Sequence, residues 1–278
     1  MACLLFLLVC CRRSQLEKSF MGVYEGTEEH VRCGEAAHEG CGARGKETLK
    51  FLFLQDFGKR ELCDGSTTTN LEPLCGRPLG LKFNPVTSDL YIDDVYFGLL
   101  MIGPNGGIAQ TLISSIEGIS FKFINELDID SGTEVIYFID SSRTFYKRFL
   151  SRSSDSSGRV ALSKNHSFSL VAKIIWRRIS KFNLETNNFE PKVFAELHRV
   201  PNNIKMNHKG EFWVALNAGS LEEINDDVPD PIGIKYDQEG RILKQLDGNG
   251  KDVFSSISEI NEVNRTLYIG SDTKLLLF

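Results

Sequence analysis

One pattern recurs between residues 81 and 270: an apolar strand, an Asn- or Asp-rich turn, and a second strand with an aromatic or aliphatic residue among β-branched neighbours. Alternating residues around a Gly, Asn or Asp turn are typical of β-hairpins. The first copy runs from Leu81-Lys82-Phe83-Asn84-Pro85 to Asp89-Leu90-Tyr91-Ile92. Because one unit is repeated along the chain, the sequence predicts an all-β repeat fold.

The spacing of this repeat indicates a β-propeller. Its anchors are Tyr91, Tyr137, Leu170, Trp213 and Tyr268, at intervals of 46, 33, 43 and 55 residues. A four-stranded propeller blade takes about 40–50 residues, so most intervals fit one blade each. The 33-residue interval is about one hairpin short, and the shortfall falls in the Ser-rich run 151–158. The alternative is an all-β sandwich, which seldom repeats one turn-plus-aromatic pattern five times.

Composition and charge exclude several classes of protein. The chain has 278 residues, of which 41% are hydrophobic and 25% charged, so it can bury a core. Its 32 basic and 37 acidic side chains give a net charge of −5 and no basic run exceeds two residues, so we expect no nucleic-acid partner. The longest apolar stretch, Met1 to Cys11, is shorter than the roughly 20 residues of a membrane-spanning helix, so we expect no integral membrane domain.

The N-terminal apolar stretch has the length of a signal-peptide core, but Arg12 and Arg13 follow it instead of preceding it. We interpret it as a degenerate secretory signal, a short anchor, or the wrong start of a mis-spliced chain. Two sequons, at Asn165 and Asn264, predict glycosylation and are compatible with a luminal route.

Two cysteines, Cys63 and Cys75, flank a polar loop at 64–70. Because no His or third Cys lies close to them in the sequence, we do not expect a zinc site. In an oxidising compartment a disulfide across the loop is the better interpretation. Together with the sequons, the cysteines favour the endomembrane system.

Several longer motifs resemble the strictosidine synthase-like proteins of plants. They are Leu62-Cys63-Asp64-Gly65-Ser66 and the segments 73–80, 95–100, 103–107, 121–123, 201–205, 210–216 and 247–250, which together extend from Arg60 to Gly270. The resemblance implies a six-bladed β-propeller, a disulfide equivalent to Cys63–Cys75, and a location in the vacuole, the endoplasmic reticulum lumen or elsewhere on the secretory pathway. It also implies kinship with lactonase and arylesterase propellers.

Two departures from the family predict an incomplete propeller. Nothing before Cys63 resembles the first blade, so we divide the chain into an unmatched segment, 1–59, and a propeller domain, 60–278, that lacks first-blade strands. Gly158-Arg159 also runs directly into Val160, so that one hairpin is missing after Arg159. A propeller closes by pairing its terminal strands in one blade, and without closure sheet edges are exposed.

The true synthase condenses an amine with an aldehyde. The resemblance implies that a glutamate late in the last blade catalyses this reaction. Counted back from Leu267-Tyr268-Ile269-Gly270, that position is Ser258, with Glu259 next to it. Adjacent strand side chains point to opposite faces, so we do not expect Glu259 to substitute. A hydroxyl at Ser258 is a poor base without an activating partner. We therefore interpret both as ordinary blade residues and expect no strictosidine synthesis.

The resemblance to lactonases implies a Ca²⁺ ion held by Asn, Asp and Glu oxygens, the ligands that this cation prefers. Asn125 matches one such position, and Asn202 and Asn203 match a pair in which relatives usually have Asp at the first place. Three neutral amides predict weak affinity. The alternative is that these amides satisfy backbone groups at turns or strand ends.

The sequence thus predicts a strictosidine synthase-like propeller of the plant endomembrane system, a monomer or weak oligomer. If active, it is a metal-assisted esterase or lactonase-type hydrolase of a small molecule. The alternatives are a non-catalytic or degenerate, truncated propeller and, behind it, the condensing enzyme. Two further features carry no predicted chemistry: His198 is interpreted as a solvated loop residue, and Trp176-Arg177-Arg178 with Lys173 as a charged strand face.

Overall fold

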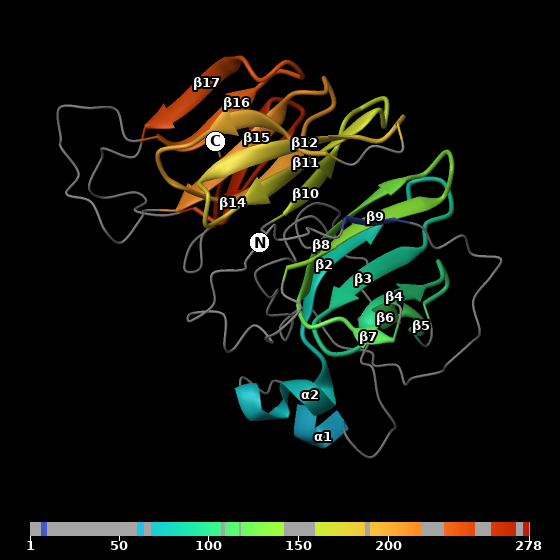
Figure 1. Cartoon of the computed structure of the whole chain (residues 1–278). Coiled ribbons are helices and arrows are strands. Elements are labelled where there is room, and N and C mark those ends of the chain that lie inside the picture. Colours follow the sequence, from blue (N-terminus) through green and yellow to red (C-terminus); the bar gives the residue numbers. More distant parts are fainter. Residues whose placement is uncertain are drawn as a thin grey trace. The chain divides into compact units, whose positions relative to one another are not determined.

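The computed structural model describes residues 7–9, 60–63, 68–106, 109–116, 118–141, 159–186, 190–217, 231–247, 257–270 and 275–277. Antiparallel sheets dominate it, in two compact units, Met1–Asp155 and Ser156–Phe278, each of which is considered by itself (Figure 1). Helices in the described part are short: α1 (Arg60–Cys63), the 3₁₀ helix η4 (Thr69–Leu71) and α2 (Glu72–Cys75). None of these described helices has the length and apolarity needed to cross a bilayer.

The first unit contains two blade-like sheets. One has four strands in chain order: β2 (Pro78–Phe83), β3 (Leu90–Asp94), β4 (Gly98–Ile102) and β5 (Gln110–Ile113). A small hairpin follows, formed by β6 (Ser115–Ile116) and β7 (Ile119–Ser120). The second sheet begins with β8 (Ile124–Asp130) and β9 (Val135–Asp140). The first strands of the two sheets, β2 and β8, lie side by side (Figure 1).

The place of a third strand in the second sheet is taken by β1 (Leu7–Val9). This strand pairs antiparallel with β9, with Leu7 opposite Ile139 and Val9 opposite Tyr137. The 33-residue interval of the repeat, in which the spacing marks a hairpin as missing, begins at Tyr137 on β9 of this sheet. Among the described residues, only two strands of the sheet, β8 and β9, are consecutive in the chain. Three residues of the unmatched N-terminal segment therefore pair with this blade.

The second unit contains three further sheets, each antiparallel and in chain order. Their strands are β10 (Val160–Leu162), β11 (Phe168–Lys173), β12 (Arg178–Asn183) and β13 (Lys192–Glu196); β14 (Val200–Met206), β15 (Phe212–Asn217), β16 (Pro231–Tyr236) and β17 (Ile242–Asp247); and β18 (Glu259–Val263), β19 (Thr266–Gly270) and β20 (Leu275–Leu277). The first strands again adjoin, β10 beside β14 and β14 beside β18. The described residues thus hold five blade-like sheets.

The predicted repeat and fold class are confirmed. Every anchor lies on the second strand of its own sheet: Tyr91 on β3, Tyr137 on β9, Leu170 on β11, Trp213 on β15 and Tyr268 on β19. Consecutive antiparallel sheets of up to four strands, with their first strands adjoining, are the architecture of a β-propeller. The β-propeller fold class is therefore confirmed, and the sandwich is excluded.

The Asn and Asp residues of the repeat form its turns. Asn207 accepts hydrogen bonds from the backbone N–H groups of Lys209 and Glu211, both at 3.0 Å. Asp237 does the same for Glu239 and Arg241, at 3.0 and 2.8 Å. A short polar side chain that bonds the backbone two residues on replaces part of the turn's hydrogen bonding. This local chemistry explains why the same turn residues recur along the sequence.

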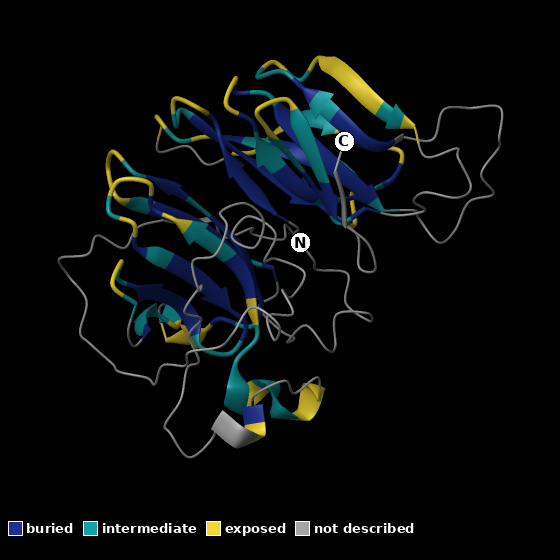
Figure 2. Cartoon of the chain, turned by 180° about the vertical axis from the view of Figure 1, so that it is seen from behind, coloured by how far each residue is buried: buried dark blue, intermediate teal, exposed yellow. Residues whose placement is uncertain are grey.

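The core lies between the sheets, because their middle strands carry apolar side chains on both faces. In the second unit, Leu170, Phe212 and Val214 are fully buried in one cluster that includes Ile234 and Tyr236. Figure 2 shows the contrast between these buried strands and the outer strand β17, whose side chains are mostly exposed. Burial of this apolar surface is the main force that holds neighbouring blades together.

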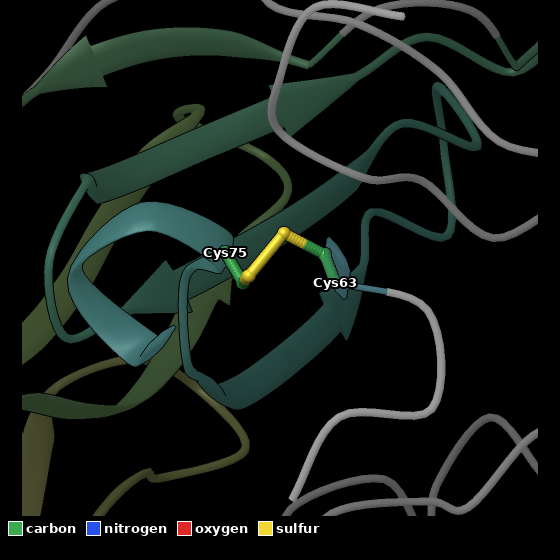
Figure 3. The surroundings of a disulfide bond; sticks show 2 residues. All are labelled: Cys63 and Cys75. Atoms are coloured by element: carbon green, nitrogen blue, oxygen red, sulfur yellow. A yellow bond between two sulfur atoms is a disulfide. The ribbon is translucent and has the colours of Figure 1, made fainter. Parts of the chain in front are cut away.

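The predicted disulfide joins Cys63 of α1 to Cys75 of α2, with their Cα atoms 5.4 Å apart (Figure 3). The helical segment is also tied to the first sheet through Glu72. Its carboxylate accepts one hydrogen bond from Arg77 Nη1 at 2.8 Å and another from the Tyr96 hydroxyl at 3.1 Å. A crosslink that closes a loop of this size stabilises a fold by about 2–3 kcal/mol.

Candidate functional site

β-Bulges recur near the start of the first strands of three sheets. The pairing register shifts between Pro78 and Gly80 in β2, between Ile124 and Leu127 in β8, and between Pro201 and Ile204 in β14. A bulge takes residues out of the ladder and redirects their side chains, and it is often found beside active sites. The predicted ligands Asn125, Asn202 and Asn203 all lie within these bulges.

In the second unit, the bulge of β14 meets the start of β18. Asn203 Nδ2 donates a hydrogen bond of 2.8 Å to Glu259 Oε2, and each residue is only 2% exposed. Asn203 Oδ1 accepts a bond from the backbone N–H of Ile204 at 3.2 Å. Burial of a carboxylate is costly unless hydrogen bonds compensate it, and the amide of Asn203 supplies one of them. The structure thus places a carboxylate against a predicted metal ligand.

Ser258 has a different environment from Glu259. Its backbone N–H and its hydroxyl both donate to the carbonyl oxygen of Gly270, at 2.8 and 3.1 Å. The two side chains do diverge as alternation requires, but Glu259, and not Ser258, meets Asn203. In β18, Glu259 is opposite Gly270 of β19. That Glu259 does not replace the glutamate of the family stays a prediction about catalysis.

Asn202 precedes Asn203 in the bulge of β14. Its Nδ2 donates to Asn217 Oδ1 at 3.4 Å, and the residue is half-buried. Amide oxygens from Asn202 and Asn203 and the carboxylate of Glu259 are the hard ligands that suit Ca²⁺. They include a carboxyl group, where sequence reasoning expected only neutral amides. Among the described residues, no group of three or more His, Cys, Asp or Glu side chains is arranged to hold a metal ion.

Asn125 belongs to the first unit, where it is 6% exposed beside the equally buried Glu126. Gly80 of β2 lies close to two acidic residues, Glu126 and Asp93. A Cβ atom at Gly80 would lie 3.1 Å from the Cα of Glu126 and 3.2 Å from the Cβ and Oδ2 atoms of Asp93, which is fully buried. Sequence reasoning missed Asp93 and Glu126. The sequence indicates each of them in one way only. Asp93 lies near the end of an apolar strand, and Glu126 directly follows the predicted ligand Asn125.

Asp94 has a strongly perturbed carboxyl. Burial raises its pKa to about 6, in spite of hydrogen bonds that its Oδ1 accepts from the backbone N–H groups of Tyr96 at 2.8 Å and Phe97 at 2.9 Å. The negative charge of Glu72 raises the pKa further. A hydrogen bond from the backbone of Arg77 also lowers this pKa, but burial outweighs all three bonds. This carboxyl shapes the turn between β3 and β4, and sequence reasoning did not single it out.

The remaining predicted residues lie at the surface. Asn165 is exposed in the turn between β10 and β11, where its Oδ1 accepts a bond of 2.8 Å from the Ser167 hydroxyl. Asn264 is exposed in the turn between β18 and β19, in the left-handed conformation with φ of 51°. His198 is exposed in the loop before β14, and its carbonyl oxygen accepts a bond of 3.2 Å from Arg177 Nη1. None of the three belongs to the Asn203–Glu259 neighbourhood as the structure describes it.

Comparisons with known proteins agree with this architecture. The chain is 35% identical over 273 aligned residues to Protein STRICTOSIDINE SYNTHASE-LIKE 10 of Arabidopsis thaliana, which covers 79% of this chain and 73% of that protein. It is 30% identical over 272 residues to Protein STRICTOSIDINE SYNTHASE-LIKE 3 of the same plant, covering 77% of this chain and 69% of that protein. No family model matches the chain.

Among solved structures, a chain of the "Crystal structure of Nidogen/Laminin Complex" superposes with a TM-score of 0.50, covering 69% of this chain and 71% of that one. At 15% identity, this likeness concerns the fold alone. The relatives in Arabidopsis, by contrast, are similar along most of their length and of this chain's. The chain belongs to the strictosidine synthase-like family of β-propeller proteins.

Proposed function

We propose that this protein is a metal-assisted hydrolase of the esterase or lactonase type, with the Asn203–Glu259 pair at the centre of its site. The observation that carries the proposal is the buried carboxylate of Glu259, hydrogen-bonded at 2.8 Å to an amide that the family resemblance marks as a ligand. A buried carboxylate beside redirected amides at strand starts is a recurrent setting for chemistry.

The residues divide the work as follows. Asn202 and Asn203 supply neutral oxygens, and Glu259 supplies the negative charge that a divalent cation requires. Bound there, Ca²⁺ would polarise the carbonyl of an ester or lactone. The hydrogen bond from Asn203 fixes the orientation of the carboxylate, which can also take up the proton that an attacking water loses. With a single charged ligand, affinity for calcium falls in the weak part of the usual range.

The test is hydrolysis of phenyl acetate and of an aliphatic lactone by the purified full chain, in the presence of calcium and after chelation. The proposal expects turnover that the chelator abolishes and that added calcium restores. If neither substrate class is turned over at any calcium concentration, the hydrolase proposal fails.

A second candidate rests on the same carboxylate. In the condensation of an amine with an aldehyde, a carboxylate takes a proton from the ammonium nucleophile and later one from the ring carbon. The sequence argument against this reaction placed Glu259 on the opposite face from Ser258; the bond of Glu259 to Asn203, a predicted ligand, supports a role for this carboxylate. Mass spectrometry of a mixture with tryptamine and secologanin tests it. Condensed product without ester turnover favours this candidate, and the absence of both products favours a non-catalytic, degenerate propeller.

We also propose that the protein resides on the secretory pathway, in the vacuole or the endoplasmic reticulum lumen, with glycans at Asn165 and Asn264. The disulfide between Cys63 and Cys75 supports an oxidising compartment, and both asparagines are exposed in turns. Protein expressed in plant cells should lose the mass of two glycans on deglycosylation. Asn165→Gln and Asn264→Gln should each remove one of the two glycans. A mass that does not change on deglycosylation would contradict the proposal.

A further inference from the structure

The hairpin between β11 and β12 ends in an exposed apolar tip. Ile175 is 43% exposed and Trp176 is 50% exposed, although both are large hydrophobic residues. The turn is closed by the Arg177 N–H, which donates to the carbonyl oxygen of Ile174 at 3.2 Å, and Arg177 adopts a left-handed conformation with φ of 44°. Two consecutive apolar side chains therefore project from an ordered turn into solvent.

Cations surround this indole. The guanidinium carbon of Arg178 lies 4.5 Å from the centroid of the Trp176 ring, and Lys173 Nζ lies 5.3 Å from it. Both distances are typical of cation–π contacts. Arg177 is a third cation in the same turn, and the carboxylate residue opposite Arg178 in the sheet is Glu196. We call residues 173–178 the Trp176 tip, a segment in which the partly exposed Arg177 and Arg178 and the buried Lys173 accompany two exposed apolar side chains.

We propose that the Trp176 tip binds the surface of a membrane that contains anionic lipids. Tryptophan is enriched at the membrane–water interface, where its ring reaches the acyl chains and its N–H stays near the headgroups. Ile175 adds apolar area beside it, and the partly exposed guanidinium groups of Arg177 and Arg178 attract lipid phosphates. A protein partner is disfavoured, because stable protein interfaces bury about 800 Å² on each side and one hairpin end offers far less.

The attraction to lipid is local. The whole chain carries a net charge of −5, so the protein as a whole is repelled by an anionic surface. At physiological salt, charges are screened beyond about 8 Å, so the cations of the tip act only once the tip is close to the membrane. Binding should therefore depend on both the apolar side chains and the lipid charge, and it should weaken in high salt.

The tip adjoins the loop that leads into the candidate site. The Leu197 N–H donates to the Arg177 carbonyl at 2.8 Å, and Arg177 Nη1 donates to the His198 carbonyl at 3.2 Å. Val200, the first residue of β14, follows this loop closely, so the tip lies at the end of the sheets where Asn202 and Asn203 are found. Docking would turn this end of the second unit towards the lipid. The docking proposal stands on the tip alone and does not require the proposed hydrolase activity.

Tryptophan fluorescence gives a direct readout in the full chain. The sequence contains two tryptophans, and Trp213 is only 1% exposed, so a change on addition of lipid reports Trp176. We expect phosphatidylcholine vesicles that contain phosphatidylserine to shift the emission to the blue and to protect it from acrylamide. Vesicles of phosphatidylcholine alone, or high salt, should give a much smaller change.

Variants then locate the contact. Ile175→Ser combined with Trp176→Ala should weaken cosedimentation with phosphatidylserine vesicles about tenfold or more. Ile242→Ser is the matched control, because Ile242 is 53% exposed on β17, away from the tip, and should leave binding unchanged. Circular dichroism checks that both variants fold.

Three results would overturn the proposal. One is a wild-type chain that neither cosediments nor changes its emission with vesicles. Another is equal vesicle binding by the wild type and the double variant. The third is a wild-type chain that does not bind vesicles but self-associates as its concentration rises, where the double variant stays monomeric. That result would assign the tip to contact with a second copy of the chain.

Discussion

The side-chain amide of Asn203 donates a 2.8 Å hydrogen bond to the carboxylate of Glu259, and this bond joins the first strands of two neighbouring sheets, β14 and β18. Both residues are almost completely buried. The pair brings a carboxyl group to a place where the sequence suggested only neutral amides. It therefore changes both the metal chemistry and the proton chemistry that the second unit can support.

Asp94 predicts a pH-dependent stability. Burial raises its pKa from 3.8 to about 6, so folding favours the protonated carboxyl. The stabilisation is complete below pH of about 4 and is lost as the pH rises through about 6, with a full difference of up to about 3 kcal/mol. Urea unfolding of the wild type and of Asp94→Asn measures it. The free-energy advantage of the variant should be largest at pH 7.5 and should shrink towards pH 4.5; parallel pH profiles would contradict the assignment.

The close packing around Gly80 leaves little space for a larger residue at this position. A Cβ atom there would lie 3.1 Å from the Cα of Glu126, a backbone atom that cannot move aside without shifting β8. Gly80→Ala should therefore lower the free energy of unfolding by about 1–3 kcal/mol. Gly103→Ala is the matched control, since its Cβ would meet only Asp89 Oδ1, at 3.9 Å. Equal effects of the two substitutions in urea unfolding would show that β2 and β8 are not closely packed at Gly80.

Lys235 forms ion pairs with carboxylates of two neighbouring blades. Its Nζ lies 3.0 Å from Glu211 Oε2 and 3.3 Å from Glu262 Oε2, and Trp213 Nε1 donates to the same Glu262 oxygen at 2.7 Å. Burial alone would raise the pKa of both carboxyls, but these hydrogen bonds and the positive charge outweigh it and hold the pKa below the usual value. A carboxyl with a lowered pKa stabilises the fold above its unfolded pKa and loses this contribution as the pH falls.

Replacement of this lysine removes the cation and leaves the two carboxylates facing each other. Lys235→Met should cost about 2 kcal/mol at pH 7 and much less at pH 4, where the carboxyls become protonated. Lys244→Met, at the exposed position opposite Lys235 on β17, is the control and should change little at either pH. A loss that is independent of pH would mean that packing, and not charge, explains the effect.

Much of the fold was predictable because its turn chemistry is local. Asn207 and Asp237 each bond backbone groups within four residues, so the turn and its flanking strands can be read from a short stretch of sequence. The pairing of β1 with β9 was not predictable in this way. It joins residues about 130 positions apart through backbone hydrogen bonds, and such pairing leaves no local pattern.

The candidate site was predicted only in part. Asn203 could be named from its resemblance to a ligand position, and its bulge is confirmed by the register shift in β14. Glu259 was named from the sequence, but its bond to Asn203 was not predictable, because it joins residues 56 positions apart on the first strands of two different sheets. Asp94 was missed because its raised pKa arises from burial among residues distant in the sequence.

The most direct test of the account is kcat/KM for the best ester or lactone substrate in two neighbouring variants. Glu259→Gln retains an oxygen that accepts the bond from Asn203 but removes the charge, and Ser258→Ala removes a hydroxyl that bonds only the Gly270 carbonyl among the described residues. The account predicts a loss of about 100-fold or more in Glu259→Gln and a change within about threefold in Ser258→Ala. Retained activity in Glu259→Gln, or a larger loss in Ser258→Ala, would contradict it.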